Sequence, residues 1–250
     1  MPLNEAVSDR TSAESSSARE HPVATSLLRK VHGLNGVLVL GGYTCLHLVQ
    51  GFSALSSREA WVDRVSMFPL ANAATIVVLV GLVTHVVTGL ALSRQHADDP
   101  VAAIEPTAAL GLRRLQQLTG LVLLAVFAVH LIHLWPLTRH DPLLARSGYV
   151  ALQHWLETPS GLAFYVLATT ALAFHLSHGL SRLLVSVGIV RGTAGLRVTR
   201  YLAGALGIAL WCLTLHWVGH FANGVGVWPI TGEDDPLPKD ASGQEGELSP

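Results

Sequence analysis

The sequence is poor in charged residues, and those it has are unevenly distributed. Only 13% of its 250 residues are charged, half are hydrophobic, and the mean hydropathy is +0.44. A water-soluble globular domain has a more polar composition than this, so that class is excluded. Five stretches carry no charge, and each exceeds the roughly 20 residues that a helix needs to cross a bilayer. They are Val31–Ser57, Val65–Ser93, Leu115–Thr138, Thr158–Ser181 and Tyr201–Gly232, which predicts five transmembrane helices.

Cysteine is scarce and positive charge does not accumulate. The two cysteines, Cys45 and Cys212, are too few for an iron-sulfur cluster, which takes four ligands. The net charge of -1 leaves no basic surface for nucleic acid, so that partner is excluded. The sequence also lacks the HExxH motif of zinc hydrolases and any GxGxxG dinucleotide motif.

The two ends of the chain differ from its middle. Residues 1–26, rich in Ser, Glu and Ala, are predicted to be a disordered cytoplasmic tail, and residues 233–250 an acidic external tail. Residues 27–232 form the predicted five-helix domain. With the N-terminus inside, eleven Lys and Arg residues face the cytoplasm and five face outward. We therefore expect a multi-pass protein of the cell's inner (plasma) membrane with an external C-terminus.

Two further features are expected on the outer side. Tyr149, Leu152 and Trp155 recur every three residues between the third and fourth spans, which predicts a short helix along the membrane surface. Tryptophans gather there as an aromatic belt does; they are Trp61, Trp135, Trp155, Trp217 and Trp228.

Histidine is abundant, with 13 residues, and its positions follow a pattern. Each of the first four spans has one histidine past its midpoint, and these are His47, His85, His130 and His175. Because successive spans run in opposite directions, His47 and His130 lie about 5 Å outside the membrane centre. His85 and His175 lie about 8 Å inside it, about 13 Å from the other level.

Two levels with two imidazoles each suit two six-coordinate b haems stacked across the bilayer. Any one of these histidines could instead be a hydrogen-bonding bridge between helices. Metal transport is less well supported, because the five runs contain no Asp or Glu. Glycines near the histidines, such as Gly120 before His130, permit close approach of a flat macrocycle, or serve ordinary helix packing.

Four segments carry a resemblance to a known family. They are RKVHGLNGVLVL with LHLVQ, LVTHVVTGL, LQQLTGLVLLAVFAVHLIH and ETPSGLAFYVLATTALAFHLSHGL. They resemble the haem-bearing spans of the five-helix, two-haem cytochrome b subunit of succinate:quinone oxidoreductases, the succinate dehydrogenase type with a single anchor polypeptide. The similarity runs from about Leu27 to Ala222.

The resemblance implies roles for individual residues. His47 and His130 would ligate the outer (distal) haem, and His85 and His175 the inner (proximal) haem. Family members often have Arg at the position of Gln117, which Arg113 or Arg114 could replace. Fumarate reductases of this architecture that move protons have Glu where this chain has Ala173, which favours succinate oxidation. Roles near a propionate, a quinone or a proton relay stay open for five more histidines, His32, His133, His178, His216 and His220.

The expected function is that of a membrane anchor and electron conduit, the membrane subunit of a succinate dehydrogenase or fumarate reductase complex. A flavoprotein subunit would oxidise succinate, and an iron-sulfur subunit would pass electrons through the two haems to quinone, with menaquinone expected. This chain would hold no dicarboxylate chemistry. Two alternatives remain, a cytochrome b subunit of a hydrogenase or formate dehydrogenase, and a haem-free transporter with histidine-based proton coupling.

Overall fold

The structure is a computed structural model that describes residues 25–66, 71–94, 106–134 and 142–223. Nearly all of these residues are helical, and none of them lies in a β-strand. Five helices are long and apolar enough to cross a membrane, which confirms the predicted all-α class with five candidate spans. Both predicted tails lie almost entirely outside the described residues.

The first span is one continuous helix, Thr25–Leu55, whose hydrogen-bonding pattern changes along its length. Residues 25–34 are α-helical, η1 (Asn35–Gly41) is a π-helix, α2 (Gly42–Phe52) is α-helical again, and η2 (Ser53–Leu55) is a 3₁₀ turn. π-Helical segments are uncommon and frequently occur at functional sites. Nothing in the apolar pattern predicted this one.

The other spans follow in chain order, with short helices between them. They are α4 (Ala71–Ser93), α5 (Pro106–Leu134), α7 (Pro159–Ser186) and α8 (Gly192–Asn223), while α3 (Arg58–Ser66) and α6 (Pro142–Leu156) are the short ones. The predicted helix between the third and fourth spans is α6, whereas α3 was not predicted. Several spans extend past their uncharged run, as α5 does through Arg113 and Arg114. Long basic side chains tolerate this position because they can reach the interface.

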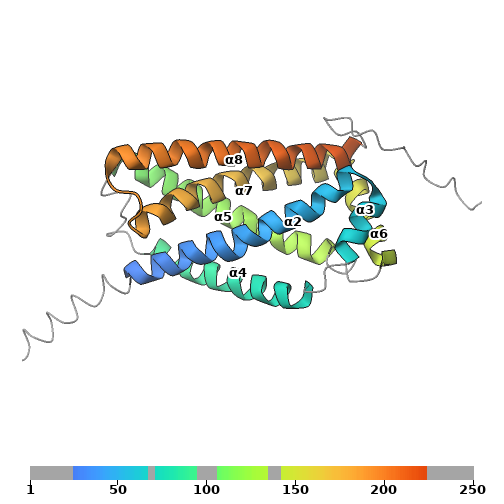
Figure 1. Cartoon of the computed structure of the whole chain (residues 1–250), viewed down its shortest axis with the longest axis horizontal. Coiled ribbons are helices and arrows are strands. Elements are labelled where there is room, and N and C mark those ends of the chain that lie inside the picture. Colours follow the sequence, from blue (N-terminus) through green and yellow to red (C-terminus); the bar gives the residue numbers. More distant parts are fainter. Residues whose placement is uncertain (1–24, 67–70, 95–105, 135–141, 224–250) are drawn as a thin grey trace, which may run out of the picture.

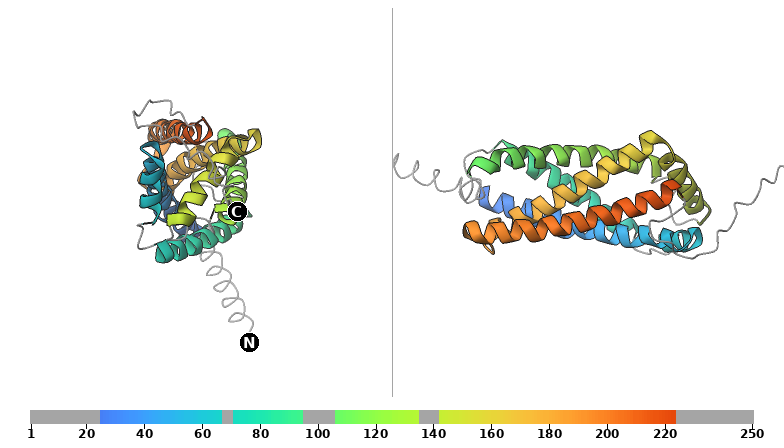
Figure 2. Two further views of the ribbon diagram at one scale, coloured as in Figure 1. Left: turned by 90° about the vertical axis from the view of Figure 1, so that its right-hand side faces the viewer. Right: turned by 90° about the horizontal axis from the view of Figure 1, so that it is seen from above.

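The spans lie side by side as an elongated bundle (Figure 1). α8 packs mainly on α7, α7 also packs on α5, and α4 packs on the first span. α4 and α8 lie on opposite sides of the bundle, with the first span, α5 and α7 between them (Figures 1 and 2). This arrangement leaves the interior bounded chiefly by the first four spans, as predicted for the histidine-bearing helices.

Local sequence explains how α7 starts and how it meets α8. The Thr158 hydroxyl accepts a hydrogen bond from the Gly161 amide at 3.1 Å, and Pro159 follows at the first helical position. The turn to α8 uses Gly188 and Gly192 at φ of 80° and 70°, a backbone region that favours glycine. So short a turn makes α7 and α8 antiparallel neighbours.

One end of the bundle holds most of the buried apolar side chains. α6 closes this end against α7 and α8, and α3 packs on α6 and on the end of the first span (Figure 1). The cluster contains Ala54, Trp61, Val62, Tyr149, Leu152, Leu156, Tyr165, Trp217, Val218 and Phe221, with Trp155 packed against it. Three of the five tryptophans predicted at the outer surface therefore gather at one end; Trp135 and Trp228 lie outside the described residues.

The sides of the bundle are apolar and exposed. Ile132 on α5 is 74% exposed and Leu206 on α8 is 53% exposed, with many similar side chains on every span. Such surfaces would be costly in water, and they match lipid chains instead.

Candidate functional site

The structure brings His47 and His130 together from the first and third spans. His47 lies on α2 and His130 on α5. Their ring centroids are 5.8 Å apart, and the ring planes are perpendicular. This is the pair that the sequence predicted for the outer level.

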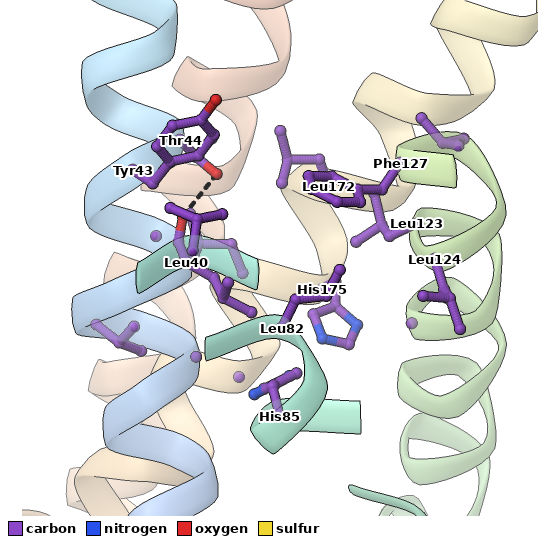
Figure 3. A pocket seen from close by; sticks show the side chains of 18 of the residues that line it. Leu40, Tyr43, Thr44, Leu82, His85, Leu123, Leu124, Phe127, Leu172 and His175 are labelled. Carbon is purple, nitrogen blue, oxygen red and sulfur yellow. Dashed lines mark hydrogen bonds between the residues drawn. The ribbon is translucent and has the colours of Figure 1, made fainter. Parts of the chain in front are cut away.

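His85 and His175 form a second pair, from α4 and α7. Their ring centroids are 6.1 Å apart with an interplanar angle of 69°. Figure 3 shows both rings on the wall of one pocket, with Leu82 and Leu172 nearby. This is the pair that the sequence predicted for the inner level.

Both separations suit two imidazoles on opposite sides of one metal ion. An ion lies about 2 Å from a coordinating imidazole nitrogen, as in zinc sites, so two ring centroids facing it lie about 6 Å apart. The observed 5.8 and 6.1 Å agree with this value. Each pair is therefore spaced for bis-histidine ligation.

The two pairs occupy different levels along the bundle. Tyr165, which contacts His130, is ten residues from His175 on α7, a rise of about 15 Å. Gly36, which contacts the His85 ring, is eleven residues before His47 on the first span, so this span also separates the two levels. The rise along α7 agrees with the separation of about 13 Å counted from the sequence.

Hydrogen bonds fix which ring nitrogen remains available in the inner pair. His85 Nδ1 donates to the His32 carbonyl at 3.2 Å, and His175 Nδ1 donates to the Gln116 carbonyl at 3.2 Å. A carbonyl can only accept, so each Nδ1 carries the proton and each Nε2 keeps its lone pair. Metal-ligating histidines commonly donate their other ring N–H to a carbonyl or carboxylate in this way.

The outer pair is supported differently. His130 Nδ1 lies 3.0 Å from the Tyr165 hydroxyl. Tyr165 is 5% exposed and packs against Trp155 and Phe164. A rigidly held phenol oxygen thus takes the place that backbone carbonyls have in the inner pair.

Two glycines make room for the inner rings. A Cβ at Gly36 would lie 2.6 Å from His85 Cε1, and one at Gly120 would lie 3.0 Å from His175 Cε1. Both contacts cross from one helix to another. The sequence associated Gly120 with His130 on its own helix, but in the structure it borders His175.

A single large cavity of about 1300 Å³ connects the two pairs. All four histidines line it, and its other walls are mainly apolar, including Leu40, Leu124 and Phe127 (Figure 3). Single small-molecule sites typically measure about 300–1,000 Å³. Within the described residues, no three His, Cys, Asp or Glu side chains could hold a bare metal ion. The residues present therefore fit flat, mainly apolar cofactors that each need two imidazoles.

Arginines line the cavity at the end away from α3 and α6. They are Arg29, Arg113 and Arg182, from three different spans. The Arg113 guanidinium donates to the carbonyls of Leu92 and Ser93, at 3.1 and 3.0 Å, and so completes the C-terminus of α4. Gln117, where the family often has Arg, also lines the cavity.

The remaining histidines separate into distinct environments. His32 lines the cavity and stacks on the His85 ring with centroids 3.9 Å apart, a contact that sequence reasoning missed. His178 is buried on α7 and stacks on Phe174. His220 Nε2 donates to the Ala54 carbonyl at 2.9 Å, so it forms part of a polar seam against the first span. The side chain of His133 lies outside the described part of the structure.

Gln116 is a second residue that sequence reasoning missed. Its carbonyl accepts from His175 Nδ1, and its side-chain amide donates to the His175 carbonyl at 3.0 Å. These reciprocal bonds hold α5 and α7 in a fixed register at the inner pair. The LQQLTG segment belongs to the family resemblance, but the sequence alone does not predict that Gln116 contacts His175 on α7.

A comparison with known proteins agrees with this arrangement. No family model matches the chain, and no solved structure matches it significantly. The succinate dehydrogenase cytochrome b558 subunit of Bacillus subtilis (strain 168) is 25% identical over 189 residues, which are 73% of this chain and 90% of that protein. The predicted resemblance is thereby confirmed: over most of its length, this five-helix chain is similar to a succinate dehydrogenase cytochrome b subunit.

Proposed function

We propose that this chain is the membrane anchor and electron-transfer subunit of a succinate:quinone oxidoreductase, with two b haems held by His47 with His130 and by His85 with His175. The observation that carries this proposal is the presence of two imidazole pairs at ligand spacing on two levels of one cavity. The similarity to a succinate dehydrogenase cytochrome b subunit supports the same assignment.

The protein's part in this function is to hold and orient. A b haem held by both histidines of a pair would supply one-electron transfer. The carbonyls of His32 and Gln116 keep the inner imidazoles in the ligating tautomer. Apolar walls keep water away, and in this low-dielectric interior each hydrogen bond is stronger and costs more free energy to break.

The arginine-bearing end of the bundle suits charged partners. Arg29 and Arg182 are placed to meet the propionates of the inner haem, since both line the cavity there. Arg114 and Arg197 are exposed at this same end, at the starts of α5 and α8. We expect them to face the iron-sulfur subunit, which in turn binds the flavoprotein subunit. Arg113, at the same end, donates hydrogen bonds to the last carbonyls of α4 instead.

We expect this end to lie in the cytoplasm and the C-terminus to be external, because basic residues are more frequent on the cytoplasmic side of membrane proteins. Quinone reduction near the outer haem would then move electrons outward across the membrane. With an inside-negative potential, that movement releases about 2.3 kcal/mol per charge per 100 mV. Such a contribution helps electrons reach a low-potential acceptor, and this favours menaquinone.

The test is spectroscopic. Membranes containing the complete complex should show b-type absorption in a reduced-minus-oxidised spectrum, and addition of succinate should reduce it. Purification should recover the flavoprotein and iron-sulfur subunits with this chain. A complex without b-type absorption would contradict the proposal and favour the haem-free transporter.

A further inference from the structure

The ring of His32 stacks directly on the ring of His85, which is a predicted haem ligand. Its ring lies flat on the His85 ring, with centroids 3.9 Å apart and planes inclined by 14°. The two residues lie on different helices, 53 positions apart in the sequence. Such face-to-face contact restricts rotation of the His85 ring about its own side-chain bonds.

Hydrogen bonds lock the two residues in both directions. His32 Nδ1 donates to the His85 carbonyl at 3.1 Å, and His85 Nδ1 donates to the His32 carbonyl at 3.2 Å. The Thr88 hydroxyl lies 3.0 Å from His32 Nδ1 and adds a third point of attachment. Neither ring can turn without losing a hydrogen bond inside the membrane, where replacements are scarce.

The backbone on either side leaves little alternative space. A Cβ at Gly89 would lie 3.0 Å from His32 Cε1, just as one at Gly36 would lie 2.6 Å from His85 Cε1. Each ring therefore occupies a recess made by a glycine of the opposite helix. His85, in turn, stands 6.1 Å from His175, at ligand spacing.

We propose that His32 is a positioning residue of the inner haem site, whose ring fixes the plane in which the His85 imidazole faces the iron. This inference rests on the proposed function, since it needs His85 to be a ligand. The corresponding contact at the outer pair is looser: Tyr43 stacks on His47 with ring centroids 5.7 Å apart and planes inclined by 13°. Among the described residues, the close stack with reciprocal backbone hydrogen bonds is a feature of the inner pair.

The experiment compares His32→Ala and His32→Phe in the intact complex. Both keep the backbone carbonyl that accepts from His85 Nδ1, so any change reports the side chain. The readouts are the midpoint potential and the low-spin electron paramagnetic resonance signal of each haem. We expect His32→Ala to shift both for the haem that His85→Ala removes, and to leave the other haem unchanged. His32→Phe, which restores a flat ring, should return the resonance signal toward that of the unaltered protein.

Two further variants complete the test. His216→Ala, on α8 near the opposite end, is the matched control and should leave the inner haem unchanged. Thr88→Val removes the hydroxyl beside His32 Nδ1 and should shift the inner haem in the same direction by a smaller amount. Thr88→Val also replaces His32→Ala as the test variant if the complex with His32→Ala does not assemble.

Three results would overturn the inference. In the first, His32→Ala leaves both haems unaltered. If His32→Ala does not assemble, the same result with Thr88→Val overturns the inference. In the second, both haems change equally, which indicates general loosening. In the third, His32→Ala removes a haem that His85→Ala retains, which makes His32 the ligand. Absence of haem from the unaltered complex would be a separate result, because it contradicts the proposed function itself.

Discussion

His130 lies 5.8 Å from His47, ring centroid to centroid, although 83 positions separate them in the sequence and they belong to different spans. His85 and His175 repeat this relationship at 6.1 Å on another level. The two pairs have different neighbours, with backbone carbonyls at the inner one and a tyrosine at the outer one. Each difference can be tested separately.

The four histidines should behave as two matched pairs. His47→Ala and His130→Ala should each remove one haem, and His85→Ala and His175→Ala the other, because each haem would need both histidines of its pair. Redox titration of the absorption spectrum distinguishes the two haems. If His47→Ala and His85→Ala removed the same haem, the pairing would be wrong.

Gly36→Ala should weaken the inner site alone. The added methyl group would lie 2.6 Å from His85 Cε1, so the ring must move from its ligating position. Overpacking of this kind typically costs about 1–3 kcal/mol. We expect less inner haem per protein, measured by quantitative absorption spectroscopy. Gly42→Ala is the matched control on the same helix, because a Cβ there meets nothing within 4 Å; equal loss in both variants would contradict the explanation.

Residue counting predicted the levels of the histidines but not how they face one another. The rise per residue is constant and the spans alternate in direction, so depth follows from position in each run. Rotation about each helix axis does not follow, because in lipid a helix is apolar on all sides and has no polar face to orient it. The stacking of His32 on His85, the contact of Gly120 with His175 and the π-helix at Asn35–Gly41 all depend on rotation or local winding.

The short helix α3 was missed for another reason. Arg58–Ser66 contains four charged residues in its first seven positions, and its buried side chains, Trp61 and Val62, are adjacent in sequence. Two neighbouring apolar residues give no helical period. Its burial depends on α6, which the sequence places more than 70 residues later.

Tyr165→Phe should raise the midpoint potential of the outer haem and retain both haems. The phenol oxygen lies 3.0 Å from His130 Nδ1, and with Nε2 on the haem, Nδ1–H would donate to this oxygen and make the imidazole a stronger electron donor. Its loss favours the reduced state. Potentiometric titration measures the shift, and Tyr201→Phe, on the exposed surface of α8, is the control. A lowered potential, or a shift confined to the inner haem, would count against the predicted contact.

Phe221→Ala should destabilise the end of the bundle that α3 and α6 close. Phe221 is 1% exposed and packs against Tyr149 and Trp217. Truncation of a buried phenylalanine typically costs about 3–5 kcal/mol of unfolding free energy. Thermal unfolding of the purified complex in detergent should show a lower midpoint. Leu206→Ala, at an exposed site on the same helix, should change it little, and similar losses in both would contradict this packing.

The central claim is that four histidines hold two haems in this one chain. The most direct measurement is the haem b content of the purified complex per copy of this chain, in the unaltered protein and in His130→Ala and His175→Ala. We expect two haems in the unaltered protein and one in each variant, with different midpoint potentials for the haem that remains. A content of one or none in the unaltered protein, or the same remaining haem in both variants, would contradict it.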